Sequence, residues 1–177
     1  MIIWINGAFG VGKSSIAEEL NHKIDASFVY DPEQVGYFLW DNFPDEMRRT
    51  GNFQHIPIWR EFNYKILKYV NDSYDGTIIV PMTIYIKQYY DEIIGNLIKN
   101  NVLIRHFILS ATKATILERL IKRGEDNENW AMQHVDACIK AFDKFNAFEE
   151  DMPNQKIDTE NKSIDDIVLE ILSLSNF

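Results

Sequence analysis

The stretch Gly7-Ala8-Phe9-Gly10-Val11-Gly12-Lys13-Ser14 decides how this chain of 177 residues folds. It matches the pattern GxxxxGK[ST], in which the backbone N–H groups of a glycine-rich loop surround a phosphate chain. The apolar run 2–5 before it is typical of a buried strand, and residues 15–20 after it are typical of a helix. A helix that begins directly after the loop adds unpaired N–H donors and the positive end of its dipole. The sequence therefore predicts a polyphosphate site at the end of the first strand.

The same loop predicts ATP and Mg²⁺ as cofactors. Lys13 is expected to reach the β- and γ-phosphates, and the hydroxyl of Ser14 is expected to bind Mg²⁺. The residues that we expect to contact the nucleotide are Gly7, Ala8, Phe9, Gly10, Val11, Gly12, Lys13, Ser14 and Ser15. The alternative is a glycine-rich turn that matches by chance, but residue identity, spacing and the strand–loop–helix context agree on the site.

Alternating strand and helix patterns run along the whole chain. Strands are predicted at 2–6, 27–30, 77–81, 102–109 and 156–158, and helices at 13–23, 33–42, 54–71, 87–100, 113–123, 129–148 and 164–172. Repeated βα alternation predicts an α/β fold, with a parallel sheet covered by helices on both faces and ligands at the carboxyl ends of the strands. The length and the lack of a linker predict a single domain over 1–177.

Composition limits the possible partners. The net charge of −9 disfavours nucleic acid, because such binding depends on Lys and Arg neutralising phosphates. A single cysteine, Cys138, cannot form an internal disulfide, and no apolar stretch approaches the roughly 20 residues of a membrane-spanning helix. The first predicted strand begins at Ile2, which leaves no room for a targeting segment. We therefore expect a cytoplasmic protein, either a monomer or a homodimer, that binds a nucleotide and a small molecule.

Asp31 follows the second predicted strand and should face the same crevice as the loop. It could hold a water on Mg²⁺ or accept a proton from a hydroxyl that attacks the γ-phosphate. Asp31-Pro32-Glu33 is also a good helix start, with Asp31 as the N-cap, and a capping carboxylate is a weaker base. A role in positioning metal or water is therefore favoured over strong base catalysis.

The third predicted strand lacks a residue that related sites often have. Many phosphate-loop enzymes place an acid after this strand to help hold Mg²⁺, whereas Pro81, Met82 and Thr83 stand here. Thr83 offers a hydroxyl to a substrate but no charge. Asp31 is then the leading candidate for the carboxylate near the metal, and slow turnover of a bound nucleotide is the alternative.

Arg119 and Arg123 are four residues apart and so lie on one face of a predicted helix. Two guanidinium groups there could close over the phosphates and stabilise the charge that develops in phosphoryl transfer. On spacing alone, however, an ordinary solvated face is the more common explanation, since Glu118 and Lys122 lie alongside.

The region between Tyr37 and Tyr64 holds eight of the 23 aromatic residues of the chain. Such side chains line apolar ligand pockets, although most aromatics pack in a core. From this region we expect Trp40 and Trp59 to contact an acceptor, and Arg60 to meet its polar group or phosphate. A surface ion pair of Arg60 with Glu61 or Asp45 is the alternative.

Four segments together resemble one known family. Residues 1–10 (MIIWINGAFG), 30–33 (YDPE), 59–63 (WREFN) and 79–84 (IVPMTI) are similar to the tunicamycin-resistance (TmrB-like) ATP-binding proteins, and the match continues to residues 158–161. The resemblance implies a three-layer P-loop fold like that of small-molecule and nucleoside kinases. It further implies a five-stranded parallel sheet in the order 2-3-1-4-5 and a helical lid at approximately 119–135.

The resemblance also assigns roles to particular residues. It makes Arg119 and Arg123 phosphate contacts at the lid, places Asp158 and Thr159 in a loop on the adenine side, and places Asp31 near the acceptor. Members associated with resistance carry a further C-terminal amphipathic segment implicated in membrane association, whereas the sequence here ends at Phe177. The acidic polar face of the last predicted helix also disfavours anionic lipid, so we do not expect membrane attachment.

Two functions remain open from the sequence. One is transfer of the γ-phosphoryl group of ATP to a hydroxyl of a small molecule, such as a nucleoside-like compound or antibiotic. The other is an ATP-dependent drug-binding protein that confers tunicamycin-type resistance by sequestering the drug unmodified. The arginines and Asp31 favour the first, and the missing acid after the third strand favours the second.

Overall fold

A computed structural model of the chain describes residues 1–48, 51–124, 130–144 and 155–176. Five strands form one parallel sheet in the order β2-β3-β1-β4-β5. They are β1 (Ile2–Gly7), β2 (Ser27–Val29), β3 (Thr77–Pro81), β4 (Ile104–Ser110) and β5 (Gln155–Asp158). The predicted fold class and strand order are therefore confirmed.

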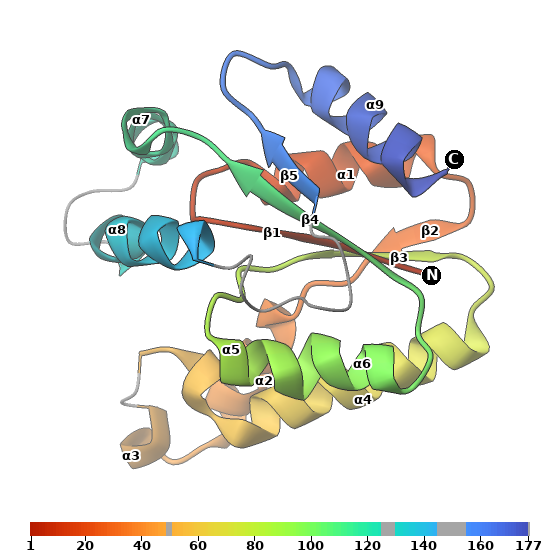
Figure 1. Cartoon of the computed structure of the whole chain (residues 1–177). Helices are drawn as coiled ribbons and strands as arrows, with labels where there is room; N and C mark the ends of the chain where they lie inside the picture. The colour runs from red at the N-terminus through yellow and green to blue at the C-terminus, as the bar shows by residue number, and fades with distance from the viewer. Residues whose placement is uncertain (49–50, 125–129, 145–154, 177) are drawn as a thin grey trace.

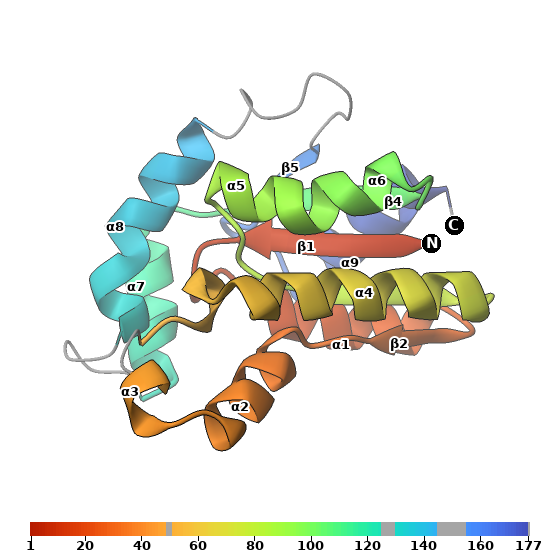
Figure 2. The same cartoon turned by 90° about the horizontal axis from the view of Figure 1, so that it is seen from below.

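Helices cover both faces of the sheet (Figure 1). On one face lie α1 (Lys13–Lys23) and α9 (Ile164–Ser175), which contact each other. On the other face lie α4 (Pro57–Ser73), α5 (Lys87–Tyr90) and α6 (Asn96–Lys99), which run side by side in both views (Figure 2). The remaining helices are α2 (Glu33–Asn42), α3 (Asp45–Arg48), α7 (Lys113–Lys122) and α8 (Trp130–Asp143).

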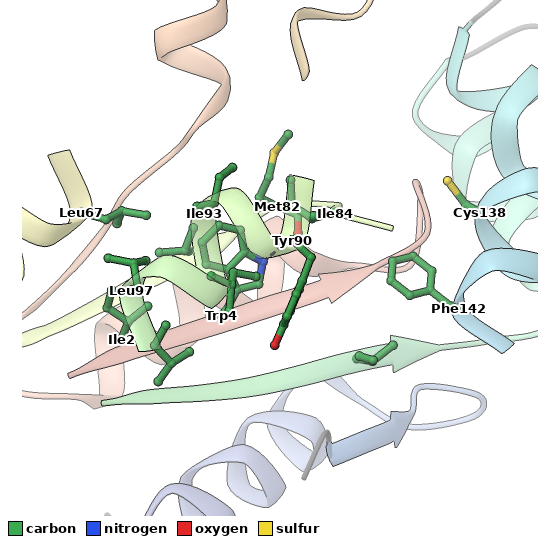
Figure 3. Packing of buried hydrophobic residues seen from close by; sticks show 14 of the residues in the cluster. Ile2, Trp4, Leu67, Met82, Ile84, Tyr90, Ile93, Leu97, Cys138 and Phe142 are labelled. Carbon is green, nitrogen blue, oxygen red and sulfur yellow. Dashed lines mark hydrogen bonds between the residues drawn. The ribbon is translucent and has the colours of Figure 1, made fainter. Parts of the chain in front are cut away.

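The two-residue period of β1 divides the core in two. Ile2 and Trp4 pack into a large cluster under α4 to α6 and α8, which Figure 3 shows around Trp4, Tyr90 and Phe142. Ile3 and Ile5 point the other way, into a smaller cluster with α1 and α9. Because β1 is buried on both faces, its sequence is a continuous apolar run, as expected for the central strand of a parallel sheet.

Most predicted elements are present, with a few differences at their ends. The predicted bounds of α1, α2 and β3 match the structure. The predicted helix 54–71 is a 3-10 turn, Phe53–His55, followed by α4, because Ile56 is extended before the proline that begins α4. The predicted helix 87–100 is interrupted by the π-helical turn Asp91–Gly95, and the short helix α3 was not predicted.

The later elements also shift. β4 begins at Ile104 instead of residue 102, β2 ends at Val29, and α9 continues to Ser175. The predicted helix 129–148 corresponds to α8, and its predicted ends lie outside the described residues. Within the described ranges, no helix has the length and apolar character needed to cross a membrane.

Candidate functional site

The predicted phosphate loop joins β1 to α1 at the carboxyl edge of the sheet. Gly10 has φ +77° and Gly12 has φ +109°, a backbone region that favours glycine. Gly12 is the N-cap of α1, and no side chain caps the helix there. The first N–H groups of α1 are therefore left for an anion, as the sequence predicts.

The loop packs tightly against its neighbours. A Cβ on Gly10 would lie 2.7 Å from Cγ of Leu120 on α7, and a Cβ on Gly7 would lie 2.6 Å from the carbonyl oxygen of Leu109 on β4. Only glycine fits at these two positions. The loop is thereby held against α7, the helix that carries Arg119.

Lys13 lies partly buried at the centre of the loop. Its Nζ donates hydrogen bonds to the carbonyl oxygens of Gly7 (3.2 Å) and Ala8 (3.0 Å), and it lies 5.7 Å from the ring centroid of Phe9. Burial lowers the pKa of Lys13 to about 8. A partly buried ammonium bound to carbonyl oxygens would be stabilised by phosphate oxygens, so the residues present fit a bound polyphosphate.

Two clefts are lined in part by this loop. The first cleft, of about 310 Å³, is lined by Gly10, Val11, Gly12, Lys13, Ser14, Ser15, Ile16, Arg119, Lys122, Arg123, Thr159, Lys162, Ile164 and Ile167. The second cleft, of about 320 Å³, is lined by Phe9, Gly10, Lys13, Ser14, Glu18, Val29, Asp31, Glu33, Pro81, Thr83 and Arg123. Gly10, Lys13, Ser14 and Arg123 line both.

Arg119 connects three segments at the first cleft. Its guanidinium donates to the carbonyl oxygen of Val11 (3.1 Å), to the hydroxyl of Thr159 (3.0 Å) and to the carbonyl oxygen of Thr159 (3.1 Å). Thr159 is buried and lies on the loop after β5, beside Asp158, whose carboxylate accepts from the backbone N–H of Glu160 (2.9 Å). Arg119 is thus a bridge between the phosphate loop and the loop after β5. It is not part of a solvated face, which was the alternative that its spacing allowed.

Arg123 is placed differently from Arg119. It is the C-cap of α7 and is exposed, and it lines both clefts. The predicted lid, 119–135, includes residues 125–129, which lie outside the described residues. The lid therefore stays a prediction.

Asp31 lies in the second cleft and also supports a helix start. One carboxylate oxygen accepts from the backbone N–H of Glu33 (2.9 Å), and the other accepts from the side-chain amide of Gln34 (3.0 Å). α2 begins at Glu33, with Pro32 directly before it. The N-cap residue is therefore Pro32 and not Asp31 as predicted, but the Asp31 carboxylate still binds the first turn of the helix.

Glu33 is a second carboxylate of this cleft that sequence reasoning missed as a functional residue. It accepts a hydrogen bond from the hydroxyl of Tyr37 (3.4 Å). Burial and the nearby charge of Asp31 raise the pKa of Glu33, while Lys13 and Arg123 act in the opposite direction. Its position two residues after Asp31, where the chain passes from β2 to α2, was the available signal. Glu18, four residues after Ser14 on α1, has the spacing that brings it onto the same helix face.

Thr83 is buried, and its hydroxyl donates to the carbonyl oxygen of Gly7 (2.8 Å). Asn6 makes a similar link, because its amide donates to the carbonyl oxygen of Ile84 (2.8 Å) and accepts from the backbone N–H of Ile84 (2.9 Å). The segment after β3 thus holds the start of the phosphate loop in place. The hydroxyl of Thr83 lines the second cleft, but its proton is used within the protein.

Oxygen ligands for Mg²⁺ are present near the loop. Ser14 and Asp31 line the same cleft, although the segment 81–83 at the end of the third strand contains no acid. Within the described residues, no group of three or more His, Cys, Asp or Glu side chains could hold a metal by itself. The donors therefore fit Mg²⁺ that is bound together with phosphate oxygens.

Three residues predicted to contact the acceptor lie elsewhere. Trp59 is fully buried, and its indole N–H donates to the carbonyl oxygen of Pro32 (3.0 Å). Trp40 packs against Phe53, with ring centroids 5.2 Å apart. Neither tryptophan is among the described residues that line the two clefts, because both side chains turn into the aromatic packing between α2 and α4.

Arg60 is also absent from the described lining of the two clefts. Its guanidinium is buried, pairs with the carboxylate of Glu92 (2.5 Å) and lies 4.4 Å from the ring centroid of Tyr89. The alternative prediction, an ion pair of Arg60 with Glu61 or Asp45, is wrong, since Glu61 pairs with Lys65 and Asp45 pairs with Arg48. Glu92 lies 32 residues away in sequence, so local pattern could not identify it.

The chain is similar in structure to several proteins of known structure. No protein-family model matches the chain, and no curated protein matches it. Among solved structures, the tunicamycin resistance protein of Deinococcus radiodurans is 25% identical with a TM-score of 0.77, and the match covers 99% of this chain and 96% of that one. The chain resembles the tunicamycin-resistance proteins. The resemblance predicted from the sequence is confirmed.

Kinases share the fold at lower identity. Deoxyadenosine kinase from M. mycoides is 20% identical with a TM-score of 0.64, covering 99% of each chain. Gluconokinase from Sinorhizobium meliloti is 14% identical with the same TM-score, covering 97% of this chain and 89% of that one. The chain therefore has the fold of the P-loop kinases.

Proposed function

We propose that the protein transfers the γ-phosphoryl group of Mg²⁺-bound ATP to a hydroxyl group of a small molecule. The observation that carries this proposal is the pair of clefts that share Gly10, Lys13, Ser14 and Arg123. ATP would occupy the first cleft, beside Thr159, and the acceptor would occupy the second. The shared residues then lie at the position where a phosphoryl group would pass from one ligand to the other.

The residues of the chain have separate tasks in this reaction. The N–H groups of the loop and Lys13 would bind the phosphates, Arg123 would stabilise the charge that develops in transfer, and Arg119 would hold the loops that surround the nucleotide. Ser14 and Asp31 would hold Mg²⁺, which when bound supplies charge neutralisation between the β- and γ-phosphates.

Either carboxylate of the second cleft could take the proton of the acceptor. Both oxygens of Asp31 accept hydrogen bonds from the first turn of α2, which makes it better suited to orienting a hydroxyl or a water. Glu33 is the more basic candidate, because burial raises its pKa. The acceptor oxygen forms a bond to the γ-phosphorus, the bond to the β-phosphate oxygen breaks, ADP leaves, and the proton passes to the carboxylate and then to water.

A second function has an observation in its favour. The protein could bind a drug in an ATP-dependent manner and release it unmodified, so that resistance arises by sequestration. The lack of an acid among Pro81, Met82 and Thr83 favours slow turnover. The similarity to a protein named for tunicamycin resistance favours a drug as the ligand.

The product distinguishes the two functions. We expect that incubation with Mg²⁺, ATP and a panel of nucleosides, nucleoside-type antibiotics (tunicamycin included), amino sugars and aminocyclitols yields one compound heavier by a phosphoryl group in mass spectrometry. Asp31→Asn should slow its formation strongly, whereas Asp41→Asn, an exposed position on α2, should not. A ligand that binds tightly only with ATP and is recovered unchanged would establish sequestration instead.

A further inference from the structure

The charges that line the second cleft restrict what can bind there. The described lining contains three carboxylates, of Glu18, Asp31 and Glu33, and two cationic side chains, of Lys13 and Arg123. Ligand charge is therefore a strong criterion for selection at this cleft, because like charges repel over short distances with little screening.

Both cations are shared with the first cleft. Lys13 belongs to the phosphate loop itself, and Arg123 stands at the end of α7 where the two clefts meet. Phosphate oxygens of a bound nucleotide would occupy these two cations. The acceptor would then meet the negative charge of the three carboxylates in the second cleft and, beside it, the negative charge of the bound nucleotide.

Arg60 would be the obvious partner for an acidic group on an acceptor, but the structure commits it elsewhere. Its side chain is only 5% exposed, donates to Glu92 and to the carbonyl oxygen of Gln54, and lies against the ring of Tyr89. Releasing it would leave the Glu92 carboxylate without this partner and would break a charge-assisted hydrogen bond. The described lining thus provides no further cation for a carboxylate or phosphate of the acceptor.

Size and the remaining walls narrow the ligand further. The cleft volume of about 320 Å³ is at the lower end of the range of about 300–1,000 Å³ that is usual for small-molecule sites. Phe9, Val29 and Pro81 provide apolar surface, and Thr83 and Ser14 provide hydroxyl oxygens. This combination suits one ring with several polar substituents.

We propose that the acceptor is a single-ring hydroxyl compound that carries a protonated amine and no acidic group. This inference rests on the function proposed above, since it treats the second cleft as the acceptor site. A protonated amine would form charge-assisted hydrogen bonds with the carboxylates, whereas a phosphate or carboxylate would be repelled by them. Sugar acids and nucleotide monophosphates are therefore excluded as acceptors.

Two matched sets of compounds test the charge preference at constant ring skeleton. The first is glucosamine, glucose and glucuronate, and the second is 2-deoxystreptamine, myo-inositol and quinate. Binding is measured by calorimetry with the full-length protein, Mg²⁺ and a non-hydrolysable ATP analogue. In at least one set we expect the amine to bind about tenfold or more tightly than the acid, with the neutral compound between them. The preference should decrease when salt is raised from about 50 mM to about 500 mM.

A substitution at the rim of the cleft tests whether the lining carboxylates cause this preference. Glu18 lines the cleft and is exposed, so Glu18→Gln should reduce the preference for the amine about two- to fivefold. Glu61→Gln is the matched control, because Glu61 is exposed on α4, pairs with Lys65 and changes the net charge equally. Equal effects of both substitutions would show that the preference comes from overall charge, and the inference would be wrong.

The outcomes separate this inference from the proposed function. If an acid binds as well as its amine counterpart, or if neither amine binds, the acceptor class is wrong. If an acid is phosphorylated, the proposed phosphoryl transfer is supported and the proposed class of acceptor is wrong. If an amine binds in the presence of ATP and is recovered unmodified, the proposed class of ligand is supported and the proposed phosphoryl transfer is wrong.

Discussion

At the scale of single residues, Lys13 is the most informative position in the molecule. Its ammonium group is partly buried and is bound only to carbonyl oxygens among the contacts described, at 3.0 and 3.2 Å. Its low pKa follows from burial. Burial disfavours the charged form of Lys13 while the site is empty, and a bound phosphate would stabilise that form. Lys13 therefore favours phosphate binding and lowers the stability of the ligand-free protein.

Replacing this lysine tests the nucleotide site directly. Lys13→Ala removes the charge that would pair with the phosphates, and we expect ATP affinity to fall about tenfold or more, which corresponds to about 1.4 kcal/mol or more. Calorimetric titration with Mg²⁺ and ATP measures the change. Unchanged affinity would show that the loop is not the nucleotide site.

The pKa of Lys13 also predicts a pH dependence. Because the pKa of Lys13 is lowered from 10.5 to about 8 in the folded protein, charging this lysine costs stability. The cost develops as pH falls from about 10.5 to about 8 and is fully present below that pH. Lys13→Met should therefore raise the free energy of unfolding of the nucleotide-free protein at pH about 7 and change it little at pH about 10.

The same linkage applies to binding. Phosphate favours the charged lysine, so ATP binding should take up a proton above pH about 8, and affinity should decline as pH rises. Calorimetry in buffers of different ionisation enthalpy detects this uptake, and an ATP affinity independent of pH in that range would contradict the assignment.

At the scale of elements, α7 organises the site. Its arginines reach the phosphate loop, the loop after β5 and both clefts, and its Leu120 packs against Gly10. The sequence predicts the same role for Arg119 and Arg123. The structure distinguishes them, because Arg119 is held by backbone carbonyls whereas Arg123 is exposed at the helix end.

This difference can be measured in kinetics. We expect Arg119→Ala to weaken ATP binding, because it releases the link between Val11 and Thr159. Arg123→Ala should lower kcat more than ATP affinity, since a contact made mainly in the transition state appears in kcat. Normal kinetics in both single variants and in the double variant would return the two arginines to the role of surface charges.

The contact between the loop and α7 has its own test. Gly10 and Gly124 both have positive φ, but only at Gly10 would a Cβ meet another residue, since nothing lies within 4 Å of the position at Gly124. Gly124→Ala should cost about 1–2 kcal/mol in free energy of unfolding from backbone strain alone. Gly10→Ala should cost more and should also weaken ATP binding. Denaturant unfolding measures the loss in free energy of unfolding for each variant, and calorimetry measures ATP affinity. Equal losses in the two variants would show that the packing of Gly10 against Leu120 does not contribute to stability.

At the scale of the whole molecule, the net charge and the local charge at the phosphate loop have opposite signs. The net charge of −9 opposes polyanions in general, whereas the loop at the carboxyl edge of the sheet concentrates Lys13, Arg119, Lys122 and Arg123 around one small cleft. The molecule can therefore favour a short phosphate chain over a long one.

A thermal-shift experiment tests this selectivity. Mg²⁺ and ATP at about 100 times the dissociation constant should stabilise the protein by about 2.7 kcal/mol, or about 5–10 °C in Tm. Single-stranded DNA at the same phosphate concentration should give no shift, and Lys13→Ala should abolish the shift with ATP. A shift with DNA would contradict the exclusion of nucleic acid.

From the sequence alone, the phosphate loop, the order of elements and the fold class could be determined. The reason is that they depend on local signals: the spacing of glycines, the apolar run of β1 and the two- and 3.6-residue periods. The bounds of α1 and α2 followed from the same signals. The position of Asp31 could be predicted as well, because the carboxyl ends of parallel strands meet at one edge of the sheet.

Only the tertiary structure decided which side chains face the clefts. Glu92, which pairs with Arg60, and Pro32, which accepts from Trp59, lie 32 and 27 residues away in sequence, and these contacts hold both side chains away from the clefts. Glu18, Asp31 and Glu33 come together because α1 and the end of β2 meet beside one loop. Sequence pattern specifies where an element runs, but the direction of a side chain depends on the packing of elements that are distant in the chain.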